Sequence, residues 1–198
     1  MPLLDKIVDQ INTAIKSSLT TKALQNNRLL GIATRYVDDS PAEGSPVPVV
    51  PYIFDNDGNG KSVEFDEGVN VSAYHRIITN QYQDDPVMVR GNDKGRVCIS
   101  EMVMVVCADR RKLQLSPLHI EAMIESTFPA TVAKSILTEI KLYKCSIQLL
   151  GSVMDPLQVF ATEYSQVPVF IKPHQAYFSI RYKVQSHFMP GCFVDCCN

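Results

Sequence analysis

The stretch RVCISEMVMVVCA, residues 96–108, decides how the rest of the chain must pack. A strand with one solvated face alternates apolar and polar side chains. Residues 102–107 are instead apolar at every position, which is typical of a strand that is covered on both faces. The sequence therefore predicts a buried strand here, and other elements must supply the cover.

Two clear helices are predicted around this strand. Residues 3–19 carry one apolar stripe at the helical period, and their other face is polar. The stripe consists of Leu4, Ile7, Val8, Ile11 and Ile15. A second helix is predicted to begin at Ser116-Pro117, because serine suits the cap and proline the first turn, and to end before Pro129. Shorter helical stretches are predicted at residues 131–140 and 156–164.

Further strands are predicted at residues 29–37, 52–54, 62–65, 69–82, 141–154 and 175–185. The last of them alternates cleanly between apolar and polar residues. Its apolar face consists of Phe178, Ile180, Tyr182 and Val184. Runs of strands outweigh regular strand–helix alternation, which favours an α+β fold. The expected architecture is a mostly antiparallel or mixed sheet flanked by an N-terminal helix and a central helix, with long extended loops.

Residues 1–198 are predicted to form a single domain, because this length supports one sizeable core and is marginal for two. An extended loop is expected at residues 38–51, where prolines remove backbone donors. A second long loop is expected at residues 83–95, and residues 186–198 are expected to form an apolar C-terminal tail.

Charge and hydropathy exclude two classes of protein. The net charge is −2 and no stretch gathers five basic residues, so binding to nucleic acid through its phosphates is not expected. No run of ~18 apolar residues occurs, so no membrane-spanning helix is expected, and the first residues lack the apolar core of a signal peptide. We therefore expect the chain to be made in a cytosol, where its six cysteines stay reduced.

Residues 55–67, DNDGNGKSVEFDE, resemble the start of a calcium-binding EF-hand loop. The candidate ligands are Asp55, Asp57, Asn59 and Asp66. The twelfth position normally holds a glutamate, and Ser62 stands where an apolar residue is usual. Prolines upstream also exclude a flanking helix. We therefore expect a polar hairpin loop between two strands, with a calcium site as the alternative.

No catalytic motif is present: the chain has no phosphate-binding loop, nucleophile elbow, zinc-protease helix or dinucleotide fingerprint. A cysteine–histidine pair can still meet in space, and Cys107 with His75 would be the first candidates. The C-terminal end also holds possible zinc ligands: His187, Cys192, Cys196 and Cys197. Their spacing matches no common zinc module. We expect no enzyme activity and no cofactor, with a small cytosolic cysteine–histidine enzyme as the alternative.

Protein–protein interaction is the remaining class. The two long loops and the C-terminal tail carry apolar residues where solvated segments should be polar, which predicts surfaces buried between subunits. The candidate interface residues are Val47, Val49, Val50, Val87, Met88, Val89, Phe188, Met189 and Phe193.

The order of elements resembles that of the tail-terminator and head-to-tail connector proteins of tailed bacteriophages. An amphipathic N-terminal helix leads into a strand and then into the segment VPYIF. The buried strand CISEMVMVVCADRR is followed by the helix SPLHIEAMIESTF, and the alternating strand YFSIRYKV comes last. The resemblance extends over most of the chain as an order of elements.

The resemblance implies a structural virion protein. Copies of a small α+β subunit would close into a ring in the phage neck or tail, through whose lumen DNA passes. The partners would be further copies of the chain and the neighbouring portal, neck or tail proteins, with no membrane. Assembly would take place in the host cytoplasm.

Overall fold

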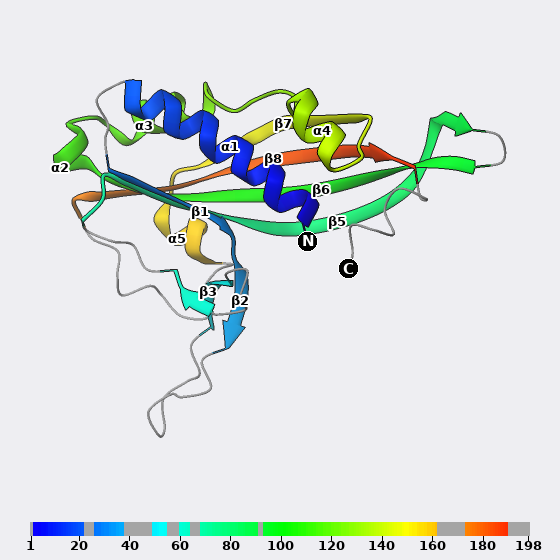
Figure 1. Cartoon of the computed structure of the whole chain (residues 1–198). Coiled ribbons are helices and arrows are strands. Elements are labelled where there is room, and N and C mark those ends of the chain that lie inside the picture. The colour runs from blue at the N-terminus through cyan, green and yellow to red at the C-terminus, as the bar shows by residue number, and fades with distance from the viewer. Residues whose placement is uncertain are drawn as a thin grey trace.

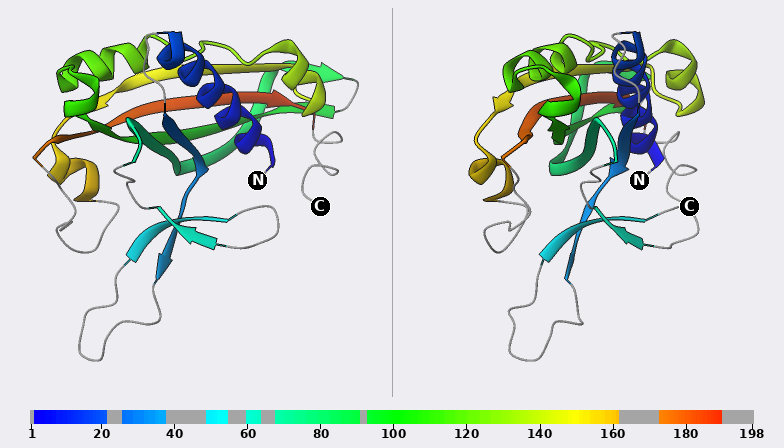
Figure 2. Two further views of the ribbon diagram at one scale, coloured as in Figure 1. Left: turned by 60° about the vertical axis from the view of Figure 1, so that its left-hand side comes forward. Right: turned by 90° about the vertical axis from the view of Figure 1, so that its left-hand side faces the viewer.

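The computed structural model describes residues 2–21, 26–37, 49–54, 60–63, 68–90, 93–161 and 173–189. A five-stranded sheet in the order β1-β5-β6-β8-β7 forms its centre. Helices α1, α3 and α4 lie on one face of this sheet, and α5 lies on the other (Figures 1 and 2). The fold is α+β, with an N-terminal and a central helix beside a mixed sheet, as the sequence predicts.

Four of the five strands pair antiparallel, and only β1 runs parallel to its neighbour, β5. The strands are β1 Asn27–Ile32, β5 Val71–Arg90, β6 Asp93–Asp109, β8 Gln175–Phe188 and β7 Lys144–Val153. The C-terminal strand β8 therefore lies between β6 and β7, which come before it in the sequence.

Strand β6 is covered on both faces, which confirms the prediction made from residues 96–108. The side chains of Met102, Met104 and Val106 belong to the core on the helix side. Those of Val105 and Cys107 belong to a second, smaller core on the other side. All five are buried, so the uninterrupted apolar run reflects packing on both sides of the sheet.

The helices pack as their sequence patterns predict. In α1, Pro2–Thr21, every residue of the predicted stripe is at most 1% exposed. Helix α3, Pro117–Glu125, is capped by Ser116, whose side chain accepts a hydrogen bond from the His119 backbone N–H. The other helices are short: α2 Arg110–Leu113, α4 Lys134–Glu139 and α5 Pro156–Ala161.

A second sheet of three short strands stands apart from the large one (Figure 1). Its strands are β2 Thr34–Val37, β3 Val49–Phe54 and β4 Gly60–Ser62. Strands β3 and β4 pair antiparallel, from Tyr52 with Ser62 to Phe54 with Gly60, so the predicted hairpin is confirmed. The Val63 N–H donates to the Pro51 carbonyl at 2.9 Å, and proline has no N–H to return the bond.

The predicted loop at residues 83–95 is wrong, because β5 runs to Arg90 and β6 begins at Asp93. Residues 83–90 and 93–95 belong to the outer end of the paired strands β5 and β6, which projects beyond the other strands (Figure 1). The pairing shifts between Asp85 and Val89, around Pro86, which cannot donate to the ladder. Gln83, Asp84, Pro86 and Val87 are all exposed, so this part of the strand shows no apolar alternation and its sequence reads as a loop.

Other boundaries also differ from the sequence prediction. Residues 29–37, expected as one strand, belong to β1 and β2 of two different sheets, and the strand expected at 62–65 is β4. Residues 49–51 of the expected proline-rich loop belong to β3, where Val49 and Val50 pair with β2. The expected tail begins too early, because β8 continues to Phe188 and buries that side chain in the main core. Phe188 is therefore a core residue and not an interface residue. Within the described ranges, no helix has the length and apolar character needed to span a membrane.

Candidate functional site

The polar group that most resembles a functional site joins three strands through Asp85, Tyr143 and His187. The Asp85 carboxylate lies 2.8 Å from His187 Nδ1 and accepts a hydrogen bond from the Tyr143 hydroxyl. Its second oxygen accepts the Val87 backbone N–H at 3.0 Å. We call Asp85, Tyr143 and His187 the clasp.

The clasp crosses the sheet over β6. Asp85 is on β5, His187 is on β8, and Tyr143 comes just before β7. The cross-strand partner of Asp85 on β6 is Gly95, which has no side chain to stand between the carboxylate and β8. The clasp therefore links β5, β8 and the start of β7 at the base of the projecting hairpin.

The clasp holds Asp85 in its ionised form. Hydrogen bonds keep the pKa of Asp85 well below its usual range. The largest effect on the pKa comes from His187, followed by Tyr143 and then the Val87 N–H. Burial, followed by the nearby Asp85 carboxylate, raises the pKa of Tyr143 well above its usual range. Tyr143 is therefore a hydrogen-bond donor at neutral pH and cannot serve as a base.

The contacts of the clasp give it a structural role. A nucleophilic site needs a hydroxyl or thiol beside the base, with the base oriented by a third group. Among the described residues, the hydroxyl in contact with His187 is that of Tyr143, whose proton is committed to Asp85. His187 Nε2 also has a partner, since it lies 3.1 Å from Gln185 Nε2.

We expect Asp85→Asn to lower the midpoint of urea unfolding at pH 7, and to lower it by a smaller amount near pH 3. A carboxyl with a depressed pKa stabilises the fold above its ordinary pKa of about 3.9, and this contribution is lost as the pH falls. Tyr143→Phe is the matched control, because it removes one hydrogen-bond donor to Asp85 and keeps the negative charge of the Asp85 carboxylate. An equal loss for Asp85→Asn at both pH values would contradict this account.

A second buried network contains His75, which sequence reasoning considered for catalysis. His75 is fully buried on the helix side of β5. Its Nδ1 lies 2.8 Å from the Tyr182 hydroxyl, and its Nε2 lies 2.9 Å from Asn12 Oδ1. The Asn12 Nδ2 donates to the Leu30 carbonyl at 2.9 Å, so Oδ1 is left as the acceptor.

This network assigns the proton on His75. A neutral imidazole donates from Nε2 to Asn12 and accepts at Nδ1 from Tyr182, which satisfies both ring nitrogens. Burial lowers the pKa of His75 to about 3 and raises that of Tyr182 far above its usual range. The group is neutral and closed to solvent, and it links α1, β5 and β8 as part of the core.

Cys107, the other catalytic candidate, is also a core residue. It lies on β6 opposite Ser72 on β5 and Tyr177 on β8. Burial raises the pKa of its thiol to about 12, so the reactive thiolate is scarce at neutral pH. In the described part of the chain no three metal-binding side chains of His, Cys, Asp or Glu come together.

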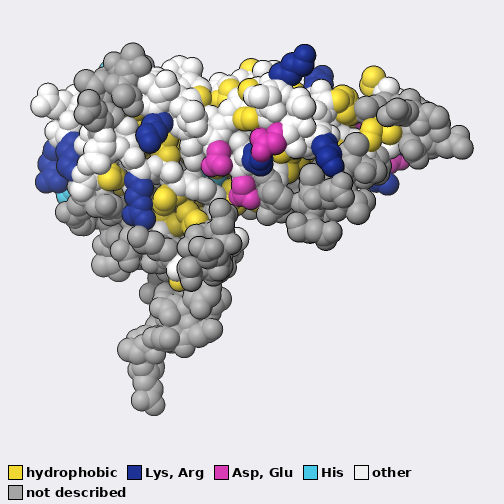
Figure 3. Space-filling view, in the orientation of Figure 1, with side chains coloured by type: hydrophobic (Ala, Val, Ile, Leu, Met, Phe, Trp, Pro, Cys, Tyr) yellow, Lys and Arg dark blue, Asp and Glu magenta, His cyan; other side chains and the backbone are white. Residues whose placement is uncertain are grey.

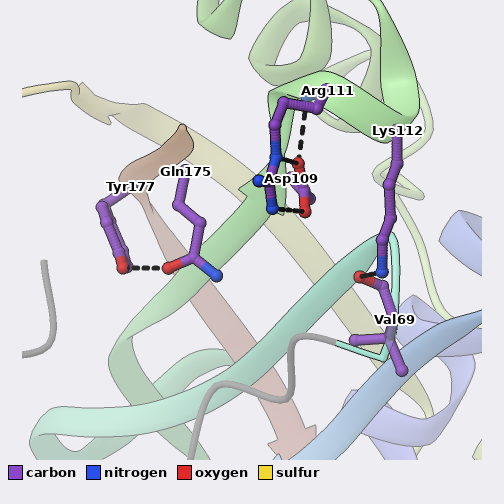
Figure 4. Close-up of polar contacts among 6 residues, drawn as sticks. All are labelled: Val69, Asp109, Arg111, Lys112, Gln175 and Tyr177. Atoms are coloured by element: carbon purple, nitrogen blue, oxygen red, sulfur yellow. Dashed lines mark hydrogen bonds and ion pairs between the residues drawn. The ribbon is translucent and has the colours of Figure 1, made fainter. Parts of the chain in front are cut away.

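The basic run Arg110-Arg111-Lys112 forms the single turn α2 at the end of β6 (Figure 4). Asp109 caps this turn by accepting the Arg111 N–H at 3.0 Å, and its other oxygen lies 3.2 Å from the Arg111 guanidinium. That guanidinium holds the pKa of Asp109 below its usual range. Lys112 reaches back to the Val69 carbonyl at 3.4 Å. These contacts tie the chain together at the strand end.

Another polar group lines a hollow of about 300 Å³ beside α5. Arg76 and Arg181 flank Val103 on the face opposite α1, and Arg181 lies 3.5 Å from Glu101. Gln158 and Ser179 complete its polar wall. Elsewhere, on the face seen in Figure 3, basic side chains lie in small separate groups among other residues. The described surface seen there shows no continuous basic stripe of the kind that holds nucleic acid.

The structure describes only some of the residues predicted as sites. Val87 is at the hairpin end and is 90% exposed, whereas Met189 is half-buried just after β8. Val49, Val50, Met88 and Val89 are placed in strands by their backbones. The other predicted interface, calcium and zinc residues lie outside the described ranges: Val47, Asp55, Asp57, Asn59, Asp66, Cys192, Phe193, Cys196 and Cys197.

Comparison with known proteins adds no assignment to this geometry. No protein-family model matches the sequence, and a search of curated proteins returned no match.

Proposed function

We propose that the protein is a structural subunit that assembles with copies of itself into a ring in the neck or tail of a tailed bacteriophage. The proposal combines the order of elements, which resembles tail-terminator and connector proteins, with the two parts of the chain that project from the main sheet. Its partners are further copies of the chain and the adjoining portal, neck or tail proteins, and DNA passes through the lumen.

The projecting parts carry the proposal. The β5–β6 hairpin continues beyond the end of β8, which is paired with Arg96, and exposes Val87 almost completely. The three-stranded sheet leaves the body in a different direction (Figures 1 and 2). A cyclic ring needs heterologous contacts, in which one surface of each copy meets a different surface of the next. Two unlike projections suit such contacts.

The buried networks favour this function over the alternative enzyme. His75 and Cys107 are both buried in the core, and both carboxylate oxygens of Asp85 have hydrogen-bond partners. The net charge of −2 is compatible with a channel that lets DNA pass without holding it.

Sedimentation velocity provides the test. We expect a species many times heavier than the 22.1 kDa chain, either alone or after mixing with candidate portal and tail proteins. The variant Val87→Asp should weaken that assembly without loss of folding, and Leu118→Asp on α3, also exposed, is the matched control. A strictly monomeric protein under all these conditions would refute the proposal.

A further inference from the structure

We infer that copies of this chain join by β-sheet pairing, with the open edge of β5 at residues 76–84 on one copy beside the open edge of β7 at residues 148–152 on the next. This inference rests on the proposed function, because it takes the ring as given and names the contact that closes it.

The edge of β5 is open over more than half of the strand. Strand β1 covers it only from Val71 to His75, and the last bond runs from the Ala33 N–H to the His75 carbonyl at 2.7 Å. Beyond His75, β6 is the only strand that pairs with β5 within the described ranges. The backbone groups on the other side of residues 76–84 therefore have no strand partner there.

The edge of β7 is open in the same way. Its first half is covered by the segment before α4, where the Ile147 N–H donates to the Ala130 carbonyl at 2.9 Å and Thr131 bridges Ser146. No described segment pairs with the outer side of β7 after Ile147. Among the described residues, β5 and β7 thus each have a segment with strand pairing on one side only.

Both edges carry exposed apolar side chains. Ile78 and Tyr82 on β5 are 41% and 51% exposed, and Leu149 and Leu150 on β7 are 36% and 44% exposed. They account for half of the eight exposed large hydrophobic side chains in the described part of the chain. An exposed apolar strand edge is a template for pairing with another strand and can cause aggregation. Burial of the edge against a neighbouring copy would remove that risk.

The direction of the strands fits a ring. From β5 through β6 and β8 to β7 each pair is antiparallel, so β7 runs opposite to β5. Copies related by rotation about a ring axis bring β7 of one copy antiparallel to β5 of the next. Each copy then uses two unlike edge segments, and a closed ring pairs both of them in every copy. Pairing of like edges would instead stop at a dimer.

The shape of both edges also fits closure. The pairing shifts by one residue between Ile77 and Thr79 on β5 and between Leu149 and Gly151 on β7. Gly151 has a φ angle of 131°, a backbone conformation that glycine adopts far more readily than residues with a side chain. The two bulges lie at the same height, because Gly151 pairs with Arg181, Arg181 with Val103, and Val103 with Arg76. Bulges increase twist and curvature, which a sheet needs in order to close on itself.

Cysteine cross-linking tests the inference on the full chain. Thr79 and Gln148 are exposed on the face opposite α1, and Gln81 and Gln83 follow Thr79 on the same face. We would pair Gln148→Cys with each of Thr79→Cys, Gln81→Cys and Gln83→Cys, in a chain whose Cys192, Cys196 and Cys197 are serine. The three positions on β5 allow for the stagger between copies that sheet closure requires.

We expect one double variant to form a ladder of cross-linked species that ends at the size of the ring. The single variants and the control pair Leu118→Cys with Gln148→Cys should form no ladder. A second measurement is the size of the charged variants Tyr82→Lys and Leu149→Lys, which should stay folded and assemble on the order of tenfold less tightly.

The outcomes separate this inference from the proposed function. A ring in sedimentation with no ladder from any of the three double variants would overturn the edge pairing and leave the ring. Dimers from the single variants would show pairing of like edges and would also overturn it. A chain that stays monomeric with its candidate partners would overturn both.

Discussion

Lowering the pH from 7 to 5 is expected to reduce the free energy of unfolding by about 2 kcal/mol through His75 alone. His75 is fully buried and hydrogen-bonded as a neutral imidazole, and burial lowers its pKa to about 3. In the unfolded chain its pKa returns to about 6.5. Between these two values the unfolded chain binds a proton that the folded chain does not, so stability falls by about 1.4 kcal/mol for each pH unit.

Urea unfolding at pH 7, 6 and 5 measures this slope. His75→Gln should be less stable than the wild type at pH 7, and its stability should change little between pH 7 and 5. His119→Gln is the matched control, because His119 is exposed on α3 and should leave the wild-type slope intact. The account fails if His75→Gln keeps that slope.

The second large effect is expected from Val105→Asp, which should cost more than about 4 kcal/mol. Val105 is fully buried in the second core, beside Val159 and Phe160 of α5. A carboxylate there would have no partner and no water, so it would remain neutral at a large cost or expel α5.

Ile99→Asp gives a matched comparison on the same strand and the same face. Ile99 is half-buried and lies between Gln81 on β5 and Gln185 on β8. An aspartate there can reach water, so we expect a loss of about 1 kcal/mol or less. Equal losses at both positions would mean that the second face is buried along its whole length. A small loss at Val105 would mean that α5 does not seal it.

Elements with a local pattern are the ones that the sequence predicts well. The apolar run at residues 102–107 and the stripe of α1 have the periods of their structures, and both are buried as expected. The end of the β5–β6 hairpin escaped prediction, since Gln83, Asp84 and Pro86 are typical of loops. A strand solvated on both faces has no periodicity by which it can be recognised.

The polar networks escaped prediction for a different reason. Asp85 is separated from Tyr143 and His187 by 58 and 102 residues, so no local motif joins them. The burial of His75 did leave a signal. Val71, Ala73, His75 and Ile77 alternate on one face of β5, and the first two are small apolar core residues. That alternation would have placed His75 toward the core, although not its contacts with Asn12 and Tyr182.

The position of β8 has a consequence for how the chain folds as it is synthesised. Until residues 175–188 have left the ribosome, one side of β6 lacks its neighbour, and β7 lacks the strand that joins it to the sheet. The Tyr182 hydroxyl that completes the His75 network arrives with the same strand. Most of the chain must therefore wait in an incomplete state with its most apolar strand paired on one side only, and in this period it is most exposed to aggregation and to chaperones.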